Sequence, residues 1–191
     1  MTIAGIILAA GSSSRMKQAK LLLLWKGEPL IRHVAIIALE CLDPVIVVTG
    51  AWEKEVTSAL GDLPVKIVHN QDWASGQSTS IRTGIYSLPQ KIEAAIFLLG
   101  DQPYISTNLL KGMSEIYSQS RPEILAPYVG ENRSNPVLFD HSIFNELSQI
   151  EGDVGARAIF KRHQITPFAW FDEKLLLDID TPEDYQKMAA E

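Results

Sequence analysis

Residues 6–20, IILAAGSSSRMKQAK, carry the clearest structural signal in this chain of 191 residues. An apolar run ends in a small polar loop that contains one glycine, Gly11, and continues to two cations, Arg15 and Lys20. A buried strand that ends in such a loop brings backbone N–H groups and positive charge to one place. The stretch therefore predicts an anion site, suited to phosphate groups, directly after the first strand.

The spacing of glycines and cations excludes two better-known phosphate loops. A Walker A loop requires Gly-Lys-Ser/Thr, and a dinucleotide-binding loop requires three glycines spaced as GxGxxG. In the loop that remains, Gly11 lets the backbone turn, Ser12 offers a hydroxyl and an N–H group, and Arg15 and Lys20 supply charge. Taken alone, the loop is equally consistent with an ordinary strand-to-helix turn, since small residues are common there.

The composition predicts one compact domain, residues 1–191, that works in a reducing cytoplasm. Hydrophobic residues make up 46% of the chain, yet no apolar run is long enough to span a bilayer. The N-terminus lacks the basic region and cleavage site of a secretory signal, and the single cysteine, Cys41, excludes an internal disulfide. The formal net charge of -6 disfavours nucleic-acid binding. Neither a nucleic acid nor a membrane is expected as a partner.

Alternating strand and helix signals predict an α/β fold with a largely parallel sheet and helices on both faces. Continuous apolar or β-branched runs are typical of strands that are covered on both faces. The expected strands are residues 6–10, 44–49, 65–68, 94–99, 135–139 and 175–180. The expected helices are residues 29–41, 51–60 and 81–88, followed by a terminal helix that opens at residue 181.

A polar loop rich in hydroxyl residues, residues 70–80, precedes the third of these helices. It contains Gly76 and is able to face a ligand. It is equally consistent with a long N-terminal cap, with Ser78 or Thr79 in the capping position. Trp73 could stack on a ring or pack against the loop, and packing is the favoured interpretation.

Asp101 directly follows the expected strand at residues 94–99, within the sequence GDQP. Open α/β sheets bind ligands at the carboxyl ends of their strands, so this carboxylate is a candidate metal ligand. The alternative is that Asp101 caps the next helix, but Ser106 and Thr107 suit that role better.

Two later segments contain further acids. GDVGAR at residues 152–157 predicts the start of a helix, in which Asp153 is ordinarily a cap. LLLDID at residues 175–180 predicts a last strand that carries Asp178 and Asp180. The four histidines lack metal-ligand spacing.

Six motifs occur in the order seen in a known family: LAAGSSSRM with Lys20, the loop at residues 70–80, GDQP, NPVLF, GDVGAR and DIDTPEDY. Over nearly its whole length the chain resembles the MobA-like nucleotidyltransferases, and within them most closely the MocA-type molybdenum cofactor cytidylyltransferases. Ala10 stands where the guanylyltransferase branch typically has a second glycine, and its methyl resembles a device that narrows the space beside the base. Lys17 departs from the glycine that usually follows Arg-Met in this family.

The resemblance implies a three-layer Rossmann-like nucleotidyltransferase fold with a mostly parallel sheet. It also implies that CMP is transferred from CTP to molybdenum-bound molybdopterin, which gives the cytosine dinucleotide cofactor and pyrophosphate. Mg²⁺ would be the cofactor, and a molybdenum hydroxylase would be a transient partner. The reaction needs no side-chain nucleophile, because the acceptor phosphate attacks the nucleotide, but metal and cations must neutralise the charge.

The resemblance further assigns roles to residues. Arg15, Lys20 and Asp101 would be catalytic, and Asp101 and Asp180 would bind the metal. The nucleotide would contact Leu8, Ala9, Ala10, Gly11, Ser12, Gly76 and Ser80, and the acceptor would contact Asn135, Asp153 and Arg157.

Two alternatives stay open. A nucleotidyltransferase that acts on a sugar phosphate or another phosphorylated acceptor would use nearly the same nucleotide and metal residues. A noncatalytic carrier of the molybdenum cofactor is a different class, but it would not need the set formed by Arg15, Lys20 and Asp101. A nicotinamide oxidoreductase is disfavoured because GxGxxG is missing.

Overall fold

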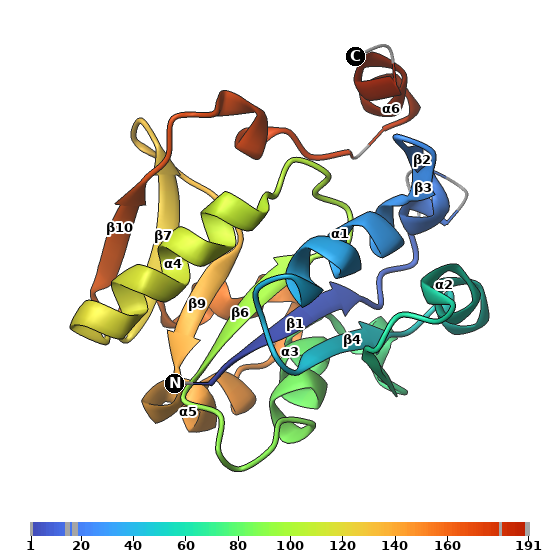
Figure 1. The fold of residues 1–191 in the computed structure, drawn as a ribbon. Coiled ribbons are helices and arrows are strands. Elements are labelled where there is room, and N and C mark those ends of the chain that lie inside the picture. Colours follow the sequence, from blue (N-terminus) through green and yellow to red (C-terminus); the bar gives the residue numbers. More distant parts are fainter. Residues whose placement is uncertain (1, 14–15, 17–18, 180, 190–191) are drawn as a thin grey trace.

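The fold is built on one large β-sheet with helices on both sides (Figure 1). The structure, a computed structural model, describes residues 2–13, 16, 19–179 and 181–189. The strands are β1 (Ile3–Ala9), β2 (Leu24–Trp25), β3 (Glu28–Pro29), β4 (Val45–Thr49), β5 (Lys66–His69), β6 (Ala94–Leu99), β7 (Ile124–Val129), β8 (Asn132–Arg133), β9 (Val137–Asp140) and β10 (Ile165–Ala169). The α-helices are α1 (Leu30–Leu39), α2 (Glu53–Leu60), α3 (Gln77–Tyr86), α4 (Thr107–Ser120), α5 (Phe144–Ser148) and α6 (Pro182–Ala189). Short 3₁₀ segments are η1 (Lys20–Leu22), η2 (Trp73–Ser75), η3 (His141–Ile143), η4 (Gly152–Ile159) and η5 (Glu173–Leu176).

The large sheet has the strand order β10-β7-β9-β6-β1-β4-β5, with β8 paired to β7. β1 runs parallel to β4 and β6, β4 to β5, and β7 to β10, whereas β9 is antiparallel to β6 and β7. The prediction of a mostly parallel sheet is therefore confirmed. Because β9 runs opposite to both of its neighbours, β7 runs in the same direction as β6. The C-terminal ends of β1, β4, β6 and β7 thus lie at one edge of the sheet.

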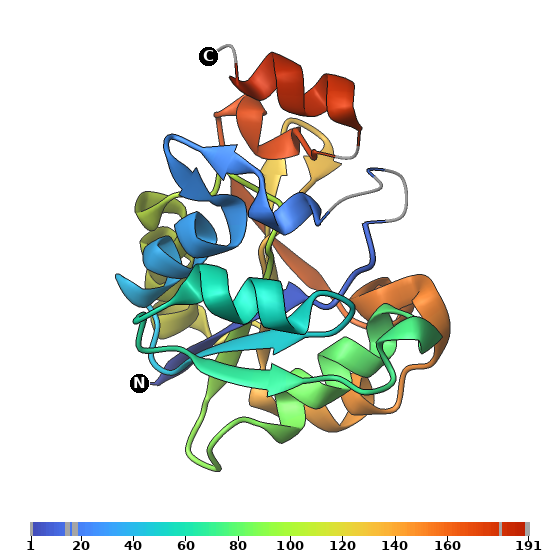
Figure 2. The ribbon, with the colours of Figure 1, turned by 90° about the vertical axis from the view of Figure 1, so that its right-hand side faces the viewer.

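Helices cover both faces of the sheet, as expected (Figures 1 and 2). Successive side chains of β1 point to opposite faces. Ile7 packs into a core shared with α1, α2 and α4, and Ile6 packs into a second core shared with α3, α5 and η4. Both isoleucines are fully buried. Coverage on two sides explains why the first strand reads as a continuous apolar run.

A glycine allows α3 to approach the sheet closely. A Cβ atom placed on Gly84, in the middle of α3, would lie 2.7 Å from Cγ2 of Ile6. The side chain that is missing at Gly84 therefore lets the helix rest directly on β1. This approach carries the N-terminus of α3 to the edge at which β1 ends.

The expected strand at residues 175–180 was wrong. Residues 173–176 form η5 instead, and residues 177–179 have no regular secondary structure. The carboxylate of Asp172 accepts a hydrogen bond from Lys174 N and starts the 3₁₀ turn. Leu175 and Ile179 are buried while Leu176 and Leu177 are exposed, a pattern that the alternation of a strand does not produce. β10, which the sequence did not indicate, is the last strand that the structure describes.

The single cysteine, Cys41, is a packed side chain at the margin of the core. Cys41 is partly buried, is free, and packs against the core that contains α1 and α4. Burial raises the pKa of its thiol, which makes the side chain a poor nucleophile near neutral pH. Within the described residues, no helix combines the length and the apolar character that crossing a bilayer requires.

His163 joins the residue before β7 to helix α5. Its Nδ1 atom lies 2.9 Å from Glu123 Oε2, and its Nε2 atom lies 2.7 Å from Glu146 Oε2. The hydrogen bonds to Glu123 and then Glu146 raise the pKa of His163 above the usual 6.5. A raised folded-state pKa stabilises the protein fully below the unfolded pKa, and this contribution is lost as the pH rises through the folded pKa.

We therefore expect His163→Gln to destabilise the protein most at mildly acidic pH. The difference in unfolding temperature between wild type and variant should shrink as the pH is raised above 6.5. Thermal unfolding followed by circular dichroism across this pH range measures the effect. His141→Gln is the control, because its ring lies 3.3 Å from one carboxylate oxygen, of Asp140, but is 67% exposed, so its pairing should contribute less. A difference that is independent of pH would show that the two carboxylates do not hold the imidazolium.

Candidate active site

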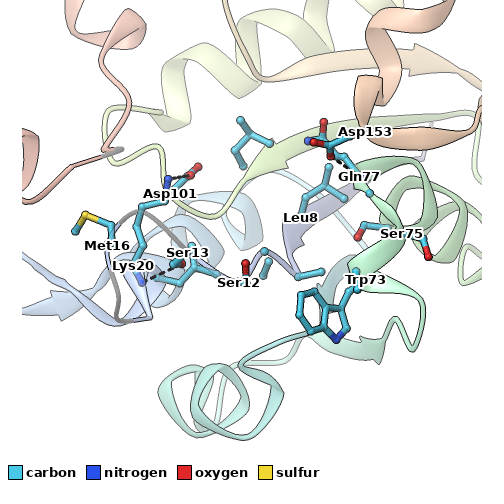
Figure 3. A pocket seen from close by; sticks show the side chains of 18 residues that line it. Leu8, Ser12, Ser13, Met16, Lys20, Trp73, Ser75, Gln77, Asp101 and Asp153 are labelled. Carbon is cyan, nitrogen blue, oxygen red and sulfur yellow. Dashed lines mark hydrogen bonds and ion pairs between the residues drawn. The ribbon is translucent and has the colours of Figure 1, made fainter.

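A cavity of about 700 Å³ lies at the edge of the sheet where β1 and β6 end. It is enclosed by the loop after β1, the turn after β6, the segment before α3, and the start of η4 (Figure 3). The sequence-predicted residues that line it are Leu8, Ala9, Ala10, Gly11, Ser12, Lys20, Gly76, Ser80, Asp101 and Asp153. The sheet thus gathers segments that are as much as 145 residues apart in the sequence, from Leu8 of the LAAG motif to Asp153 of the GDVGAR motif.

The described parts of the loop after β1 are held in place by hydrogen bonds. Trp52 Nε1 donates to the carbonyl of Ser12 (3.1 Å), and Ala51 N donates to the carbonyl of Ala10 (3.2 Å). Ser13 adopts a positive φ of 53°, and its hydroxyl accepts a hydrogen bond from Lys20 N (3.2 Å). Lys20 therefore lies beside Ser13, close to the point where the loop leaves β1.

An ion pair joins this loop to the turn after β6. Lys20 Nζ lies 2.5 Å from Asp101 Oδ2, with the two side chains 13% and 23% exposed. The pair lies at the ends of the parallel strands β1 and β6. These ends are side by side, because the N–H of Gly100 donates to the carbonyl of Leu8 (3.2 Å). Figure 3 shows both side chains on one side of the cavity. A cation and a carboxylate at this spacing can hold a phosphate and a divalent metal side by side.

The opposite wall is formed by the start of α3. Asn70 Nδ2 donates to Thr79 Oγ1 (2.8 Å) and to Ser80 Oγ (3.0 Å), which fixes the polar loop against the helix. Gly76 has a φ of 108°, and a Cβ atom there would lie 2.7 Å from the carbonyl oxygen of Gly152. Gly76 is therefore required both by its backbone conformation and by its contact with η4.

The capping of this helix differs from the expectation. Helix α3 begins at Gln77 and not at residue 81, so Ser78 and Thr79 lie inside the helix, and the alternative in which one of them is the cap is excluded. Thr79 Oγ1 instead donates to the carbonyl of Gly76 (2.8 Å). Asp153 Oδ1 accepts a hydrogen bond from Gln77 N (3.2 Å), so this acid caps α3 across 76 residues and not a helix of its own.

The segment that carries Asp153 also differs from the expectation. It forms η4, a 3₁₀ segment that is interrupted at Gly155, where φ is 60°. A side chain at Gly155 would collide with Gln77 Oε1. Gly155 thus fits the segment to the start of α3, and sequence reasoning could not supply that partner.

The remaining predicted residues fall into two groups. Arg15 and Asp180, together with the exceptional Lys17, lie outside the described residues, so their roles stay predictions. Asn135 precedes β9 and Arg157 belongs to η4, but neither lines the cavity. Gln102 Nε2 donates to Asp178 Oδ1 (2.7 Å), which places the first residue of the DID motif next to the turn that carries Asp101.

Several residues that line the cavity were not among the ligand contacts assigned from the sequence. They are Ser13, Met16, Leu21, Trp73, Ala74, Ser75, Gln77 and Leu99. Ser75 and Gln77 lie within the polar loop that the sequence did single out, so its polarity was a usable signal. Met16 and Leu99 are apolar and carried none. Trp73 faces the cavity (Figure 3), so it is available for stacking, and the preference for loop packing was incomplete.

The acids that are present suit a metal that arrives with phosphate groups. In the described part of the chain, no three His, Cys, Asp or Glu side chains form a metal-binding cluster. Mg²⁺ is typically held by one or two carboxylates together with substrate phosphates and waters, and does not need such a cluster. Asp101 fits this arrangement because it lines the cavity next to the loop after β1, whose sequence predicts an anion site.

The parallel sheet, the loop after β1 and the carboxylate after β6 define a nucleotide-binding α/β transferase. Comparison with family models refines this class: residues 5–166 match the MobA-like NTP transferase domain. The chain belongs to this family and is a nucleotidyltransferase.

Individual relatives agree on the family and differ in their names. The chain is 25% identical to the molybdenum cofactor cytidylyltransferase of Escherichia coli K12, over 94% of this chain and 92% of that protein. It is 32% identical to purine catabolism protein PucB of Bacillus subtilis 168, over 95% and 93%. The crystal structure of Rv0371c from Mycobacterium tuberculosis has the same fold, with a TM-score of 0.87, 24% identity and complete coverage of both chains. The comparisons therefore do not select one acceptor.

We expect Asp101→Asn to reduce nucleotidyl transfer by roughly a hundredfold or more while the protein stays folded, because it removes a charge that acts on the transition state. The measurement is pyrophosphate release at saturating Mg²⁺ and nucleotide. Asp62→Asn is the matched control, since its side chain is 93% exposed and does not line the cavity, so the rate should stay within about twofold. A wild-type rate for Asp101→Asn would remove this carboxylate from the reaction.

Proposed function

We propose that this protein transfers CMP from CTP to molybdenum-bound molybdopterin, which yields the cytosine dinucleotide cofactor and pyrophosphate. The observation that carries the proposal is the Lys20–Asp101 pair, 2.5 Å apart, in a cavity built by the LAAG loop, the GDQP turn and the loop before α3. The cytidylyltransferase relative supports the choice of substrates, since the similarity extends over 94% of this chain.

The proposed reaction forms one P–O bond and breaks another. A terminal phosphate oxygen of the acceptor attacks the α-phosphate of CTP, and the bond between the α-phosphate and the bridging oxygen breaks as pyrophosphate leaves. Lys20 offsets the charge on the leaving group, and Arg15 is proposed to do the same. The N–H groups of Gly11 and Ser12 would hold phosphate oxygens.

Mg²⁺ is proposed as the cofactor, with Asp101 and Asp180 as its protein ligands. When bound, it would neutralise phosphate charge and polarise the phosphoryl group. A manganese complex of Rv0371c, a protein of the same fold at 23% identity, supports a divalent metal without selecting magnesium. Because Lys20 already neutralises Asp101 in this structure, binding of metal and nucleotide would have to exchange that pairing for new ones.

The nucleoside half of CTP is proposed to lie between β1 and the start of α3. Ala10 is 5% exposed and lines the cavity next to Ala9, and Ser80 faces it from the opposite wall. Asn135, Asp153 and Arg157 are proposed for the acceptor. Because the product serves a hydroxylase, a transient contact with that enzyme in the cytoplasm is part of the proposal.

A different phosphorylated acceptor is the main alternative. The 32% identity to PucB, named for purine catabolism, exceeds the 25% identity to the cytidylyltransferase. An enzyme that acts on a sugar phosphate or another phosphorylated acceptor would bind its nucleotide at the same site. These sequence identities therefore bear only on the choice of acceptor. A noncatalytic carrier is less consistent with the site, because a carrier has no use for a paired lysine and aspartate at a triphosphate loop.

The decisive experiment identifies products. The purified protein is incubated with each nucleoside triphosphate in turn, Mg²⁺ and purified molybdenum cofactor, and the products are identified by mass spectrometry. We expect the cytosine dinucleotide in the CTP reaction, and none with Asp101→Asn. Turnover of a different nucleotide, or none with this acceptor, would overturn the proposed substrates while leaving the family intact.

Base selection gives a separate prediction. Ala10→Gly should relax the preference for CTP over GTP, because removal of the methyl opens space for a larger base. The change should be partial, since one methyl in a pocket is worth only about 1–3 kcal/mol of discrimination. The ratio of kcat/KM for the two nucleotides measures it. Ala74→Gly removes a methyl elsewhere on the cavity wall and should leave the ratio as it is. An unchanged ratio in Ala10→Gly would place base selection at other residues.

A further inference from the structure

The loop after β1 is held from outside the cavity by the segment that leads into α2. Ala51 N donates to the carbonyl of Ala10 (3.2 Å), and Trp52 Nε1 donates to the carbonyl of Ser12 (3.1 Å). Ala10 and Ser12 line the cavity, whereas Ala51 and Trp52 do not. The two donors therefore hold alternate carbonyl groups of the loop toward α2 and away from the cavity.

A glycine lets these two segments approach each other. β1 and β4 are paired as far as Ala9 and Thr49, and Gly50 is the next residue after β4. A Cβ atom on Gly50 would lie 2.6 Å from the carbonyl oxygen of Ala10 and 2.8 Å from its Cβ atom. Because a side chain does not fit in this space, glycine is needed for the chain after β4 to lie against the loop. The residues that follow Gly50 are thereby brought within hydrogen-bonding reach of it.

The direction of each carbonyl fixes the direction of the next N–H group. A peptide bond is planar and trans, so the C=O of one residue and the N–H of the next point in opposite directions. Because the carbonyls of Ala10 and Ser12 are held toward α2, the N–H groups of Gly11 and Ser13 point toward the cavity, which both residues line. Figure 3 shows Ser12 and Ser13 between α2, the teal helix below them, and Asp101 above them. Among the described residues, neither of these two N–H groups has a hydrogen-bond partner.

Ser13 is held in an uncommon backbone conformation. Its φ of 53° is rare for a residue with a side chain, and such a conformation persists when the surroundings hold it in place. Its carbonyl accepts from Met16 N (3.0 Å), and its hydroxyl accepts from Lys20 N (3.2 Å). These two hydrogen bonds lie within the loop, and the bond from Trp52 to the preceding carbonyl comes from outside it. Trp52 therefore fixes the peptide group that carries the N–H of Ser13.

We infer that Trp52 is a positioning residue for the nucleotide. Its indole N–H orients the peptide between Ser12 and Ser13, so that the N–H of Ser13 binds a phosphate oxygen of the triphosphate. Backbone N–H groups that converge in this way form anion sites. The inference rests on the part of the proposed function that places the triphosphate at this loop, and it is independent of the base and of the acceptor. A side chain that does not touch the nucleotide thus controls the affinity for its phosphates.

Inorganic tripolyphosphate is the probe for direct binding. In wild type we expect it to shift the backbone amide NMR signals of Gly11 and Ser13 in a saturable titration. Trp52→Phe keeps a ring that packs against the core and removes the donor. The shift at Ser13 should shrink, while Gly11 keeps its shift because Ala51 N still holds the carbonyl of Ala10. The Kd should rise about fivefold, the usual effect of one neutral hydrogen bond.

Two variants control for the loss of the indole ring. Trp170→Phe makes the same change in a tryptophan that packs against the same core and does not line the cavity, so the Kd should stay within about twofold. Trp52→Gln loses the ring and keeps an N–H donor at the same number of bonds from Cβ, so it should retain more affinity than Trp52→Phe.

Three results would overturn the role of Trp52. The first is a Ser13 signal in wild type that tripolyphosphate does not shift. The second is an equal loss of affinity in Trp52→Phe and Trp170→Phe. The third is a larger loss in Trp52→Gln than in Trp52→Phe, because the ring and not its N–H group would then hold the loop.

Kinetics separate this inference from the proposed function. Trp52→Phe should raise KM for CTP about fivefold and leave kcat and KM for the acceptor unchanged, because the contact with Ser13 exists both before and during the reaction. A fall in kcat with an unchanged KM for CTP would contradict the role in binding. If wild type does not use CTP with molybdopterin, the proposed function fails, and the tripolyphosphate titration still decides whether Trp52 positions Ser13.

Discussion

The parallel pairing of β1 with β4 on one side and β6 on the other is the constraint on which the rest of the structure depends. Parallel strands place their C-terminal ends at one edge, so the loop after β1 and the turn after β6 must meet there. The ion pair between Lys20 and Asp101 is a direct result. An antiparallel neighbour in place of β6 would have put the GDQP turn at the opposite end of the sheet.

The antiparallel strand β9 lies between β6 and β7, and its own C-terminal end points to the opposite edge of the sheet. Because β9 is antiparallel to both β6 and β7, these two strands run in the same direction. The C-terminal end of β7 therefore lies at the same edge of the sheet as the cavity. The hairpin with β8 then places Arg133 beside η4. In the strand order, β1 and β4 lie on one side of β6, and β9 and β7 lie on the other.

The contact between η4 and α3 joins two distant parts of the chain. Asp153 accepts from the first N–H of α3, and the missing side chain of Gly76 lets the backbone before α3 approach that of Gly152. An N-terminal helix end favours a negative charge, and the carboxylate of Asp153 supplies one from outside the helix. The position of the nucleotide loop therefore depends on a segment 76 residues later.

The sequence by itself determined the α/β class, the mostly parallel sheet and most residues of the cavity. It did so because buried parallel strands need continuous apolar runs, and because Gly11 and Asp101 stand at the ends of two such runs, with Lys20 in the loop that Gly11 begins. Only the tertiary structure decided which partner each polar residue takes. Asp153 looks like a local cap in sequence, and its real partner, Gln77 N, is distant in the chain. The LLLDID run has the composition of a strand. It nevertheless begins in the 3₁₀ turn that Asp172 starts and does not join the sheet, because Leu175 is buried without belonging to a strand.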